Sequence, residues 1–209
     1  MVCQTLLTMK RATPAHKEKI LDVFFNSFRD TPGILWVTGT GPKKDKKVRL
    51  LLEFAYEITS HLGEIWMSDD ENAVSFLFYW HKRKPTLYTF WLHAKLAFQV
   101  IGLRRTLEIL RRERYIQHQR PAHEPYIYLW FTASQADRNG MISMTDLKNG
   151  LFKKGHEENL PIYTETTVER ALTSYIRYGF RLFHDWKNPG RNVTVYFFRR
   201  EPSLEGITD

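Results

Sequence analysis

The segment LPIYTETTVERALTSYIRYGF, residues 160–180, decides the fold class of this chain. β-branched and aromatic residues in 161–166 predict a short strand. The next stretch, 169–178, has the spacing of a helix, and Gly179 is the residue type that terminates one. A strand followed directly by a helix indicates a mixed α/β fold rather than a helical bundle or an all-β sandwich.

Sequence patterns on both sides extend this interpretation. A turn sequence at 187–190 separates two β-rich runs, which predicts a hairpin at the C-terminal end. We expect strands at 9–12, 65–68, 73–80, 125–132, 161–166, 181–186 and 193–199, and helices at 14–28, before Gly63, at 143–154, at 169–178 and twice within 85–119, where Gly102 separates the pair. The order predicts a mixed, mostly antiparallel sheet flanked by helices.

The size and composition indicate one globular domain. The chain has 209 residues, of which 43% are hydrophobic and 26% are charged, and this composition excludes disordered, collagen-like and coiled-coil proteins. We therefore expect a single domain over residues 1–209. Cys3 is the one cysteine, which excludes an intramolecular disulfide and a cysteine-built zinc site. Without a recognisable signal sequence, the expected location is the cytoplasm.

The positive charge is concentrated in one segment. The net charge is +8, yet residues 81–120 hold ten bases and two acids, while the rest of the chain has 21 of each. Three interpretations stay open for this segment: a solvated face, an electrostatic attraction for phosphates or an acidic substrate, and a nucleic-acid surface. The last is the least favoured, because the aromatic residues nearby are expected to be buried, so no nucleic-acid partner is predicted.

Two helices are predicted within 85–119, and their environment is the open question. Residues 86–103 are apolar enough to raise a membrane interpretation, but three polar residues interrupt them, so no integral membrane segment is predicted. We expect a helix that faces the core, with an interfacial helix as the alternative. The apolar positions are Leu87, Phe90, Trp91, Ala94 and Ile101 on one face and Leu103, Leu107 and Leu110 on another.

The whole pattern resembles the GNAT N-acetyltransferase family. RATPA at 11–15, followed by a helix, is similar to the opening of many members, and 160–167 is similar to the fifth strand. The most specific likeness is Tyr-x-x-x-Gly-Phe, ending at Phe180. The resemblance covers nearly the whole chain and implies a GNAT-type sheet, with 85–119 as a basic helical insertion between the third and fourth strands.

The resemblance implies acetyl-CoA, or another acyl-CoA, as co-substrate. Members hold its pyrophosphate at a helix N-terminus with the pattern Arg/Gln-x-x-Gly-x-Gly/Ala, where backbone N–H groups meet the anion. This chain has a degenerate version in which bulky residues stand near the expected phosphate, and alanine replaces an asparagine that contacts the CoA arm. The cofactor-binding candidates are Phe131, Thr132, Arg138, Asn139, Gly140, Met141, Ile142, Ser143 and Ala171.

The resemblance also implies roles in catalysis. Backbone N–H groups around Phe131 and Thr132 would stabilise charge that develops on the thioester carbonyl. Tyr175 corresponds to the family tyrosine that protonates the leaving thiolate, and Glu165, at the end of the fifth strand, is the candidate base for the substrate amine. A structural role competes with each: Tyr175 as a core aromatic, and Glu165 as a helix cap or solvent-facing group.

The glycine-containing loop has a second interpretation. Residues 135–146 follow the spacing of an EF-hand loop, with Gly140 and Ile142 in place, but Gln135 and Asp146 replace the two strongest ligands. No second such loop is present, and the histidines lack metal-ligand spacing. We therefore predict no metal.

The sequence leads to one function and one alternative. The first is transfer of an acyl group from acyl-CoA to an amine, in a small molecule or a peptide, by direct attack. The alternative is a GNAT-fold binding or regulatory protein that has lost acyl-CoA affinity, motivated by Met141, Ile142 and Ala171. The acceptor cannot be named, and a homodimer is left open.

Overall fold

The computed structural model describes residues 9–188 and 193–204. In this part of the chain a sheet has the strand order β1-β2-β3-β4-β5-β7-β6. Cys3 and the second half of the turn at 187–190 lie outside the described residues. The strands are β1 (Met9–Arg11), β2 (Glu64–Ser68), β3 (Ala73–Tyr79), β4 (Ile127–Ser134), β5 (Ile162–Thr166), β6 (Arg181–Lys187) and β7 (Thr194–Arg200).

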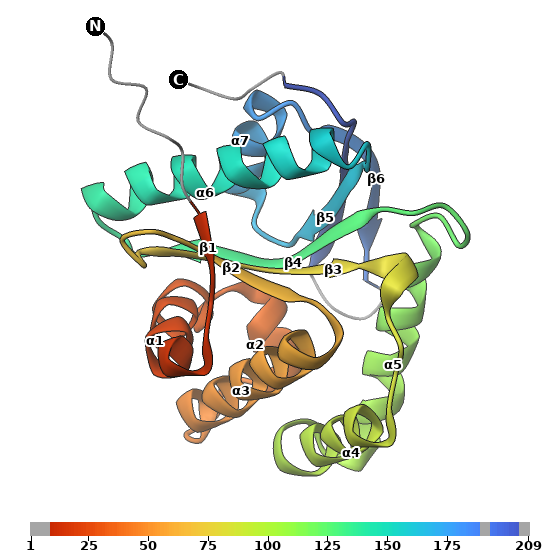
Figure 1. Ribbon diagram of the computed structural model, residues 1–209. Helices are drawn as coiled ribbons and strands as arrows, with labels where there is room; N and C mark the ends of the chain where they lie inside the picture. Colours follow the sequence, from red (N-terminus) through yellow and green to blue (C-terminus); the bar gives the residue numbers. More distant parts are fainter. Residues whose placement is uncertain (1–8, 189–192, 205–209) are drawn as a thin grey trace, which may run out of the picture.

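Helices cover both faces of the sheet. In Figure 1, α6 and α7 lie on one face, and α1 to α5 lie on the other. The α-helices are α1 (Lys17–Phe28), α2 (Pro32–Thr38), α3 (Lys44–Leu62), α4 (Leu87–Leu96), α5 (Leu103–His118), α6 (Arg138–Glu157) and α7 (Leu172–Arg177), and shorter turns are η1 (Pro14–His16), η2 (Trp80–Lys82), η3 (Ala97–Ile101, a π-helical turn) and η4 (Glu169–Ala171).

The predicted fold class is confirmed. β4 and β5 pair in parallel, and the other neighbouring strands pair antiparallel. The insertion lies between β3 and β4, the third and fourth strands, as expected. Gly102, at φ 81°, separates η3 from α5, since this left-handed backbone region favours glycine.

The core follows from the helical and strand periodicities. α3 buries Val48, Leu51, Leu52 and Ala55, which share one helix face, against the sheet. β3 is buried along its whole length because it lies inside the sheet with helices on both faces. Each fully buried large apolar side chain contributes about 1.5–3 kcal/mol to folding. These contacts fix the strands that carry the candidate site.

Three expectations need correction. The expected elements include no separate helix just after residue 28, whereas α2 begins there, with Pro32 at the first helical position, where its missing N–H costs nothing. The predicted helix at 143–154 begins earlier, at Arg138. Finally, α4 does not turn its first apolar stripe to the core, because Leu87, Phe90, Trp91 and Ala94 are exposed, as are Leu107 and Leu110 of α5.

No helix in the described ranges has the length and apolarity needed to cross a bilayer.

Candidate functional site

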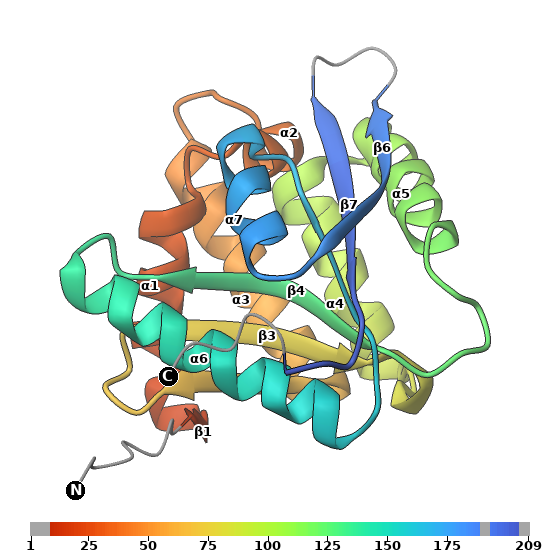
Figure 2. The same ribbon diagram turned by 90° about the horizontal axis from the view of Figure 1, so that it is seen from above.

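The two parallel strands β4 and β5 separate part-way along their length. Their paired residues are Ile127–Leu129 on β4 and Ile162–Thr164 on β5. β4 runs on to Ser134, and β5 runs on to Thr166 while its other edge is paired with β7 along the whole strand. The backbone edges of both strands beyond Leu129 and Thr164 therefore face a gap, which we call the split. Figure 2 shows the two strands diverging.

A β-bulge lies on β4 at the start of the split. Phe76 of β3 pairs with Phe131, and Leu77 pairs with Leu129, so Trp130 is an extra residue. Trp130 and Phe131 consequently pack on the same face of the sheet, with ring centroids 4.9 Å apart.

The bulge refines the prediction for the carbonyl-binding N–H groups. In a regular strand, the N–H groups of neighbours such as Phe131 and Thr132 point to opposite edges, so only one of them can face the split. The bulge places irregular backbone at Trp130 and Phe131, next to the split. Trp130 was not named from the sequence, where nothing signals a bulge.

Tyr175 lies on the α6 and α7 face of the sheet. Its ring stacks on Phe198, with centroids 4.8 Å apart, and meets Phe180 edge-on at 5.4 Å. Its hydroxyl shares a hydrogen bond with the side chain of Thr164, the last β5 residue paired with β4. Burial raises the pKa of the Tyr175 phenol. The hydroxyl is thus held neutral at the edge of the split.

Glu165 lies on the opposite face. Side chains alternate along a strand, so Glu165 points away from the face that Thr164 occupies. The Tyr128 hydroxyl donates a hydrogen bond to its carboxylate. Burial raises the pKa of Glu165, while the Arg120 charge and the Tyr128 hydrogen bond act to lower it. The carboxyl group is thus neither a helix cap nor a freely solvated group.

Arg120 completes this cluster. It follows α5, is 7% exposed, and places its guanidinium carbon 3.7 Å from the centroid of the Tyr128 ring and 4.8 Å from that of Trp80. Its Nε and Nη1 atoms are buried without a hydrogen-bond partner among the described residues. Arg120 is thus held largely by the rings, and the sequence had placed it only within the basic segment.

The predicted cofactor loop is a helix. Arg138 to Ser143 form the first turns of α6. Asp137 caps this helix, and its Oδ1 atom accepts a hydrogen bond of 2.6 Å from the Gly140 N–H. A Cβ atom on Gly140 would lie 2.0 Å from the Gln135 carbonyl oxygen. Gly140 therefore serves the close approach of the preceding loop to α6, whatever α6 binds.

The architecture matches solved acetyltransferases over nearly the whole chain. An acetyltransferase from Corynebacterium glutamicum, described as histone acetyltransferase HPA2 and related acetyltransferase, is 20% identical, with a TM-score of 0.66 over 94% of this chain and 96% of that one. A protein from Desulfovibrio desulfuricans described as an acetyltransferase of the GNAT family is 13% identical, with a TM-score of 0.52 over 94% and 99%. The chain has the GNAT fold.

A further structure with this fold is arylalkylamine N-acetyltransferase 2 from Aedes aegypti, 9% identical, with a TM-score of 0.61 over 94% of this chain and 99% of that one. No family model matches the sequence, and no curated protein does. At these identities the likeness concerns the GNAT fold alone.

The fit of an acyl-CoA to this GNAT fold is mixed. The split offers unpaired strand edges that an extended thiol arm can follow. The N-terminus of α6 offers N–H groups in its first turn. Asp137, however, already brings a carboxylate to that N-terminus, where it repels an anion. We conclude that the split fits the arm well and that the α6 N-terminus fits a pyrophosphate less well.

The remaining cofactor candidates differ in exposure. Arg138, Asn139, Met141 and Ile142 are exposed at the start of α6. Ser143 is buried, and its single hydroxyl proton has two acceptors within reach: the Asp70 carboxylate at 2.6 Å and the Asn139 carbonyl at 2.7 Å. Ala171 ends η4, just before α7. Ser143 therefore supports the fold, and the four exposed residues can meet a ligand.

The EF-hand interpretation is wrong. Residues 138–146 are helical, so the oxygens of Asn139 and Asp146 cannot converge as they do in a calcium loop. Among the described residues, no group of three histidine, cysteine, aspartate or glutamate side chains is placed to hold a metal ion.

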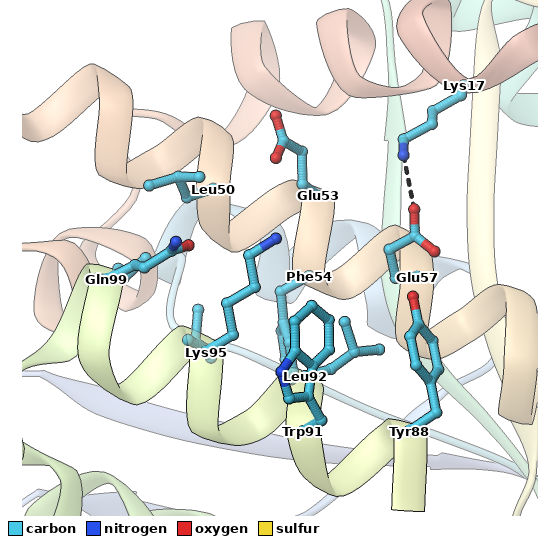
Figure 3. A pocket seen from close by; sticks show the side chains of 12 residues that line it. Lys17, Leu50, Glu53, Phe54, Glu57, Tyr88, Trp91, Leu92, Lys95 and Gln99 are labelled. Atoms are coloured by element: carbon cyan, nitrogen blue, oxygen red, sulfur yellow. Dashed lines mark hydrogen bonds and ion pairs between the residues drawn. The ribbon is translucent and has the colours of Figure 1, made fainter. Parts of the chain in front are cut away.

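A cavity of about 170 Å³ lies between α3 and α4, on the Glu165 face of the sheet (Figure 3). Phe54 forms part of its wall and also meets Trp130 of the bulge edge-on, with centroids 6.5 Å apart. Glu57 in the wall is paired with Lys17, at 2.6 Å. One aromatic side chain thus separates this cavity from the bulge.

Proposed function

We propose that the chain is an acyl-CoA-dependent N-acyltransferase, with acetyl-CoA as its co-substrate and a small-molecule or peptide amine as acceptor. One observation carries the proposal. At the split, two consecutive β5 residues serve opposite faces: Thr164 holds the Tyr175 hydroxyl on one face, and Glu165 presents its carboxylate on the other. Direct transfer uses one group of each kind, because the amine that adds to the carbonyl carbon must lose a proton and the thiolate that the tetrahedral intermediate expels must gain one.

Tyr175 is the proposed acid. An acyl-CoA supplies a thioester carbonyl and a thiol leaving group. The raised pKa of the Tyr175 phenol means that it carries a proton at neutral pH. An ordinary phenol, with a pKa of about 10, is a weak acid toward a thiolate of pKa about 8.5. Close positioning at the split is what makes the transfer effective, and the N–H groups at the bulge would share the charge on the carbonyl oxygen.

Glu165 is the proposed base. An amine must lose a proton as it forms the amide, and a carboxylate whose pKa is raised binds that proton more tightly than an exposed one. Arg120 and the Tyr128 hydrogen bond oppose this rise, because both favour the ionised carboxylate. The amine would approach from the face that holds the cavity between α3 and α4.

The pyrophosphate is proposed to lie at the start of α6, near Arg138 and Asn139, with Met141 and Ile142 beside it and Ala171 facing the CoA arm. The single cysteine is compatible with a reducing compartment, which we propose to be the cytoplasm. A homodimer remains to be tested.

A second candidate is a GNAT-fold binding protein without acyl-CoA affinity. Asp137 favours it, because its carboxylate sits at the α6 N-terminus. Met141, Ile142 and Ala171, which depart from the family pattern, point the same way.

Ligand-induced stabilisation separates the two candidates. A ligand that binds the folded state raises the melting temperature. We expect acetyl-CoA and CoA to raise the melting temperature at millimolar concentration. An assay that measures the release of free CoA thiol with a panel of amines should then identify the acceptor class. Turnover should depend on Tyr175 and Glu165. A melting temperature that neither CoA species changes would contradict the acyltransferase proposal and favour the binding protein.

A further inference from the structure

α4, together with the turn η3 that continues it, presents a stripe of large apolar side chains to solvent. Leu87 is 88% exposed, Phe90 66%, Trp91 54% and Phe98 70%. Positions 87, 90, 91, 94 and 98 recur at intervals of three and four, so these side chains share one side of the helix. Ala94 is exposed between them. We call Leu87, Phe90, Trp91, Ala94 and Phe98 the α4 stripe.

The other side of α4 accounts for its packing. Thr89 and Leu92 are buried, and in Figure 3 Leu92 lies between α4 and α3. The Thr86 side chain accepts a hydrogen bond from the Thr89 N–H and caps the helix. α4 is thus attached by its inner side. Trp91, at the edge of the stripe, also lines the cavity between α3 and α4, whereas no described part of the chain covers Leu87, Phe90 or Phe98. Two apolar sides on one helix imply that something else meets the outer one.

The charged residues of the α4 segment itself are all basic. The sequence has no acidic residue from 72 to 107. Lys82, Lys84 and Lys95 are exposed. The Lys95 Nζ atom lies 5.3 Å from the centroid of the Trp91 ring, and both side chains line the rim of the cavity between α3 and α4. The carboxylates on the facing helix α3 are Glu53 and Glu57, and Glu57 is paired with Lys17.

α5 continues the pattern. Leu107 is 63% exposed and Leu110 44%, and Arg111 and Arg114 are exposed at the next positions on the same side of the helix. Both helices lie on the face of the sheet opposite α6 (Figure 1).

We propose that α4 docks on an anionic lipid surface. Exposed Phe, Trp and Leu side chains beside lysines are the composition of helices that lie in a membrane interface: the apolar side enters the boundary of the acyl chains, and the bases meet the headgroup phosphates. The helix lies on the membrane and does not span it, consistent with its ten residues. The proposal is independent of acyl transfer.

Two other occupants fit less well. In a symmetric dimer through this stripe, the lysines beside it would meet the same lysines of the second copy, which brings like charges together. Single-stranded nucleic acid stacks on flat aromatic platforms, whereas this stripe mixes aromatic rings with the aliphatic Leu87 and Ala94. Anionic lipid satisfies both the charge and the apolar side chains.

Flotation with vesicles tests the proposal. The full chain is mixed with vesicles of phosphatidylcholine alone or of phosphatidylcholine with phosphatidylserine. We expect flotation with the mixed vesicles and weaker flotation with phosphatidylcholine alone. Added salt should reduce the difference between the two, because it screens the attraction of lysines to anionic headgroups.

Matched variants assign any binding to the stripe. Phe90→Ser and Phe98→Ser should each lower the partition coefficient by about tenfold, since each removes a large apolar side chain from the interface. The control is Ile176→Ser with Leu204→Ser, because these residues are 59% and 55% exposed elsewhere. Lys84→Glu with Lys95→Glu should abolish the preference for anionic vesicles, whereas Lys153→Glu with Arg181→Glu makes the same change of net charge elsewhere and should preserve it. Melting temperatures establish that every variant is folded.

Several results would overturn the proposal. One is no flotation of the unmodified chain with mixed vesicles, and another is equal flotation of the stripe and control variants. Light scattering would assign the stripe to a second copy if it showed a dimer that dissociates in Phe90→Ser while the unmodified chain does not bind vesicles. Binding of a single-stranded oligonucleotide that Phe90→Ser removes, again without vesicle binding, would assign it to nucleic acid.

Discussion

The Tyr128 hydroxyl donates a hydrogen bond to the Glu165 carboxylate, across the one parallel strand pair in the described sheet. Burial raises the pKa of Tyr128 well above its usual range, so this hydroxyl keeps its proton. Arg120 lies against the same ring. The carboxylate at the split is thus held by a donor from the neighbouring strand and a cation from the end of the insertion.

Glu165→Gln removes the proposed base and should lower turnover by about 10²-fold or more. In the unmodified chain, the rate should rise with pH as Glu165 loses its proton, with a midpoint above the ordinary pKa of a glutamate, because burial raises this one. The variant should lack this limb of the profile. Glu169→Gln, which alters an exposed carboxylate in η4, is the control. An unaltered limb in Glu165→Gln would assign the base to another group.

Tyr128→Phe should move that limb rather than abolish it. The hydrogen bond from Tyr128 stabilises the ionised form of Glu165, so its loss should raise the pKa of Glu165 and shift the midpoint to higher pH. A rate profile measured over the same pH range checks this. A merely structural role for Tyr128 would change the melting temperature and leave the midpoint in place.

Tyr175→Phe should lower turnover by about 10²-fold or more while acetyl-CoA binding persists. The ring contacts with Phe198 and Phe180 do not involve the hydroxyl, so only the hydrogen bond to Thr164 is lost and the melting temperature should fall by a few degrees at most. Tyr178→Phe, at the residue that follows α7, is the matched control. Equal turnover in the Tyr175→Phe and unmodified chains would mean that the thiolate leaves without this acid.

Local sequence patterns predicted the elements that local physics decides. The periodicity of α3, its end at Gly63 and the turn at Gly102 all depend on neighbouring residues, and each was confirmed. The start of α6 was missed because the pattern around Gly140 suggested a phosphate loop, although Asp137 is a good helix cap.

Features that depend on contacts between distant segments could not be predicted from local sequence patterns. Periodicity showed that Leu87, Phe90 and Trp91 share a face but not whether another element covers it, and the structure leaves it exposed. The split and the bulge at Trp130 depend on how distant strands pair. Arg120 is buried against rings contributed by β4 and η2, a contact that spacing within its own segment does not contain.

Gly140→Ala should destabilise the fold whether or not α6 binds a cofactor. The added Cβ atom would lie 2.0 Å from the Gln135 carbonyl oxygen, so the backbone must move. We expect a loss of about 2 kcal/mol, or a melting temperature lower by about 5 °C. Gly41→Ala, where no atom lies within 4 Å of the added Cβ, is the control. A stable Gly140→Ala variant would show that the loop adapts freely.

Asp137→Asn tests the α6 N-terminus as the pyrophosphate site. Asparagine caps a helix about as well as aspartate, so this change removes the negative charge and keeps the hydrogen bond to the Gly140 N–H. If the pyrophosphate lies there, the Kd for CoA should fall by about 2–5-fold, the usual strength of a charge near a helix terminus. Asp45→Asn, in the first turn of α3, makes the same change of net charge elsewhere. Asp137→Ala loses the cap as well and should cost about 1 kcal/mol of stability. If the Kd for CoA is unchanged in Asp137→Asn, as it should be in Asp45→Asn, the pyrophosphate lies away from α6. The Asp137 carboxylate would then no longer argue against an enzyme.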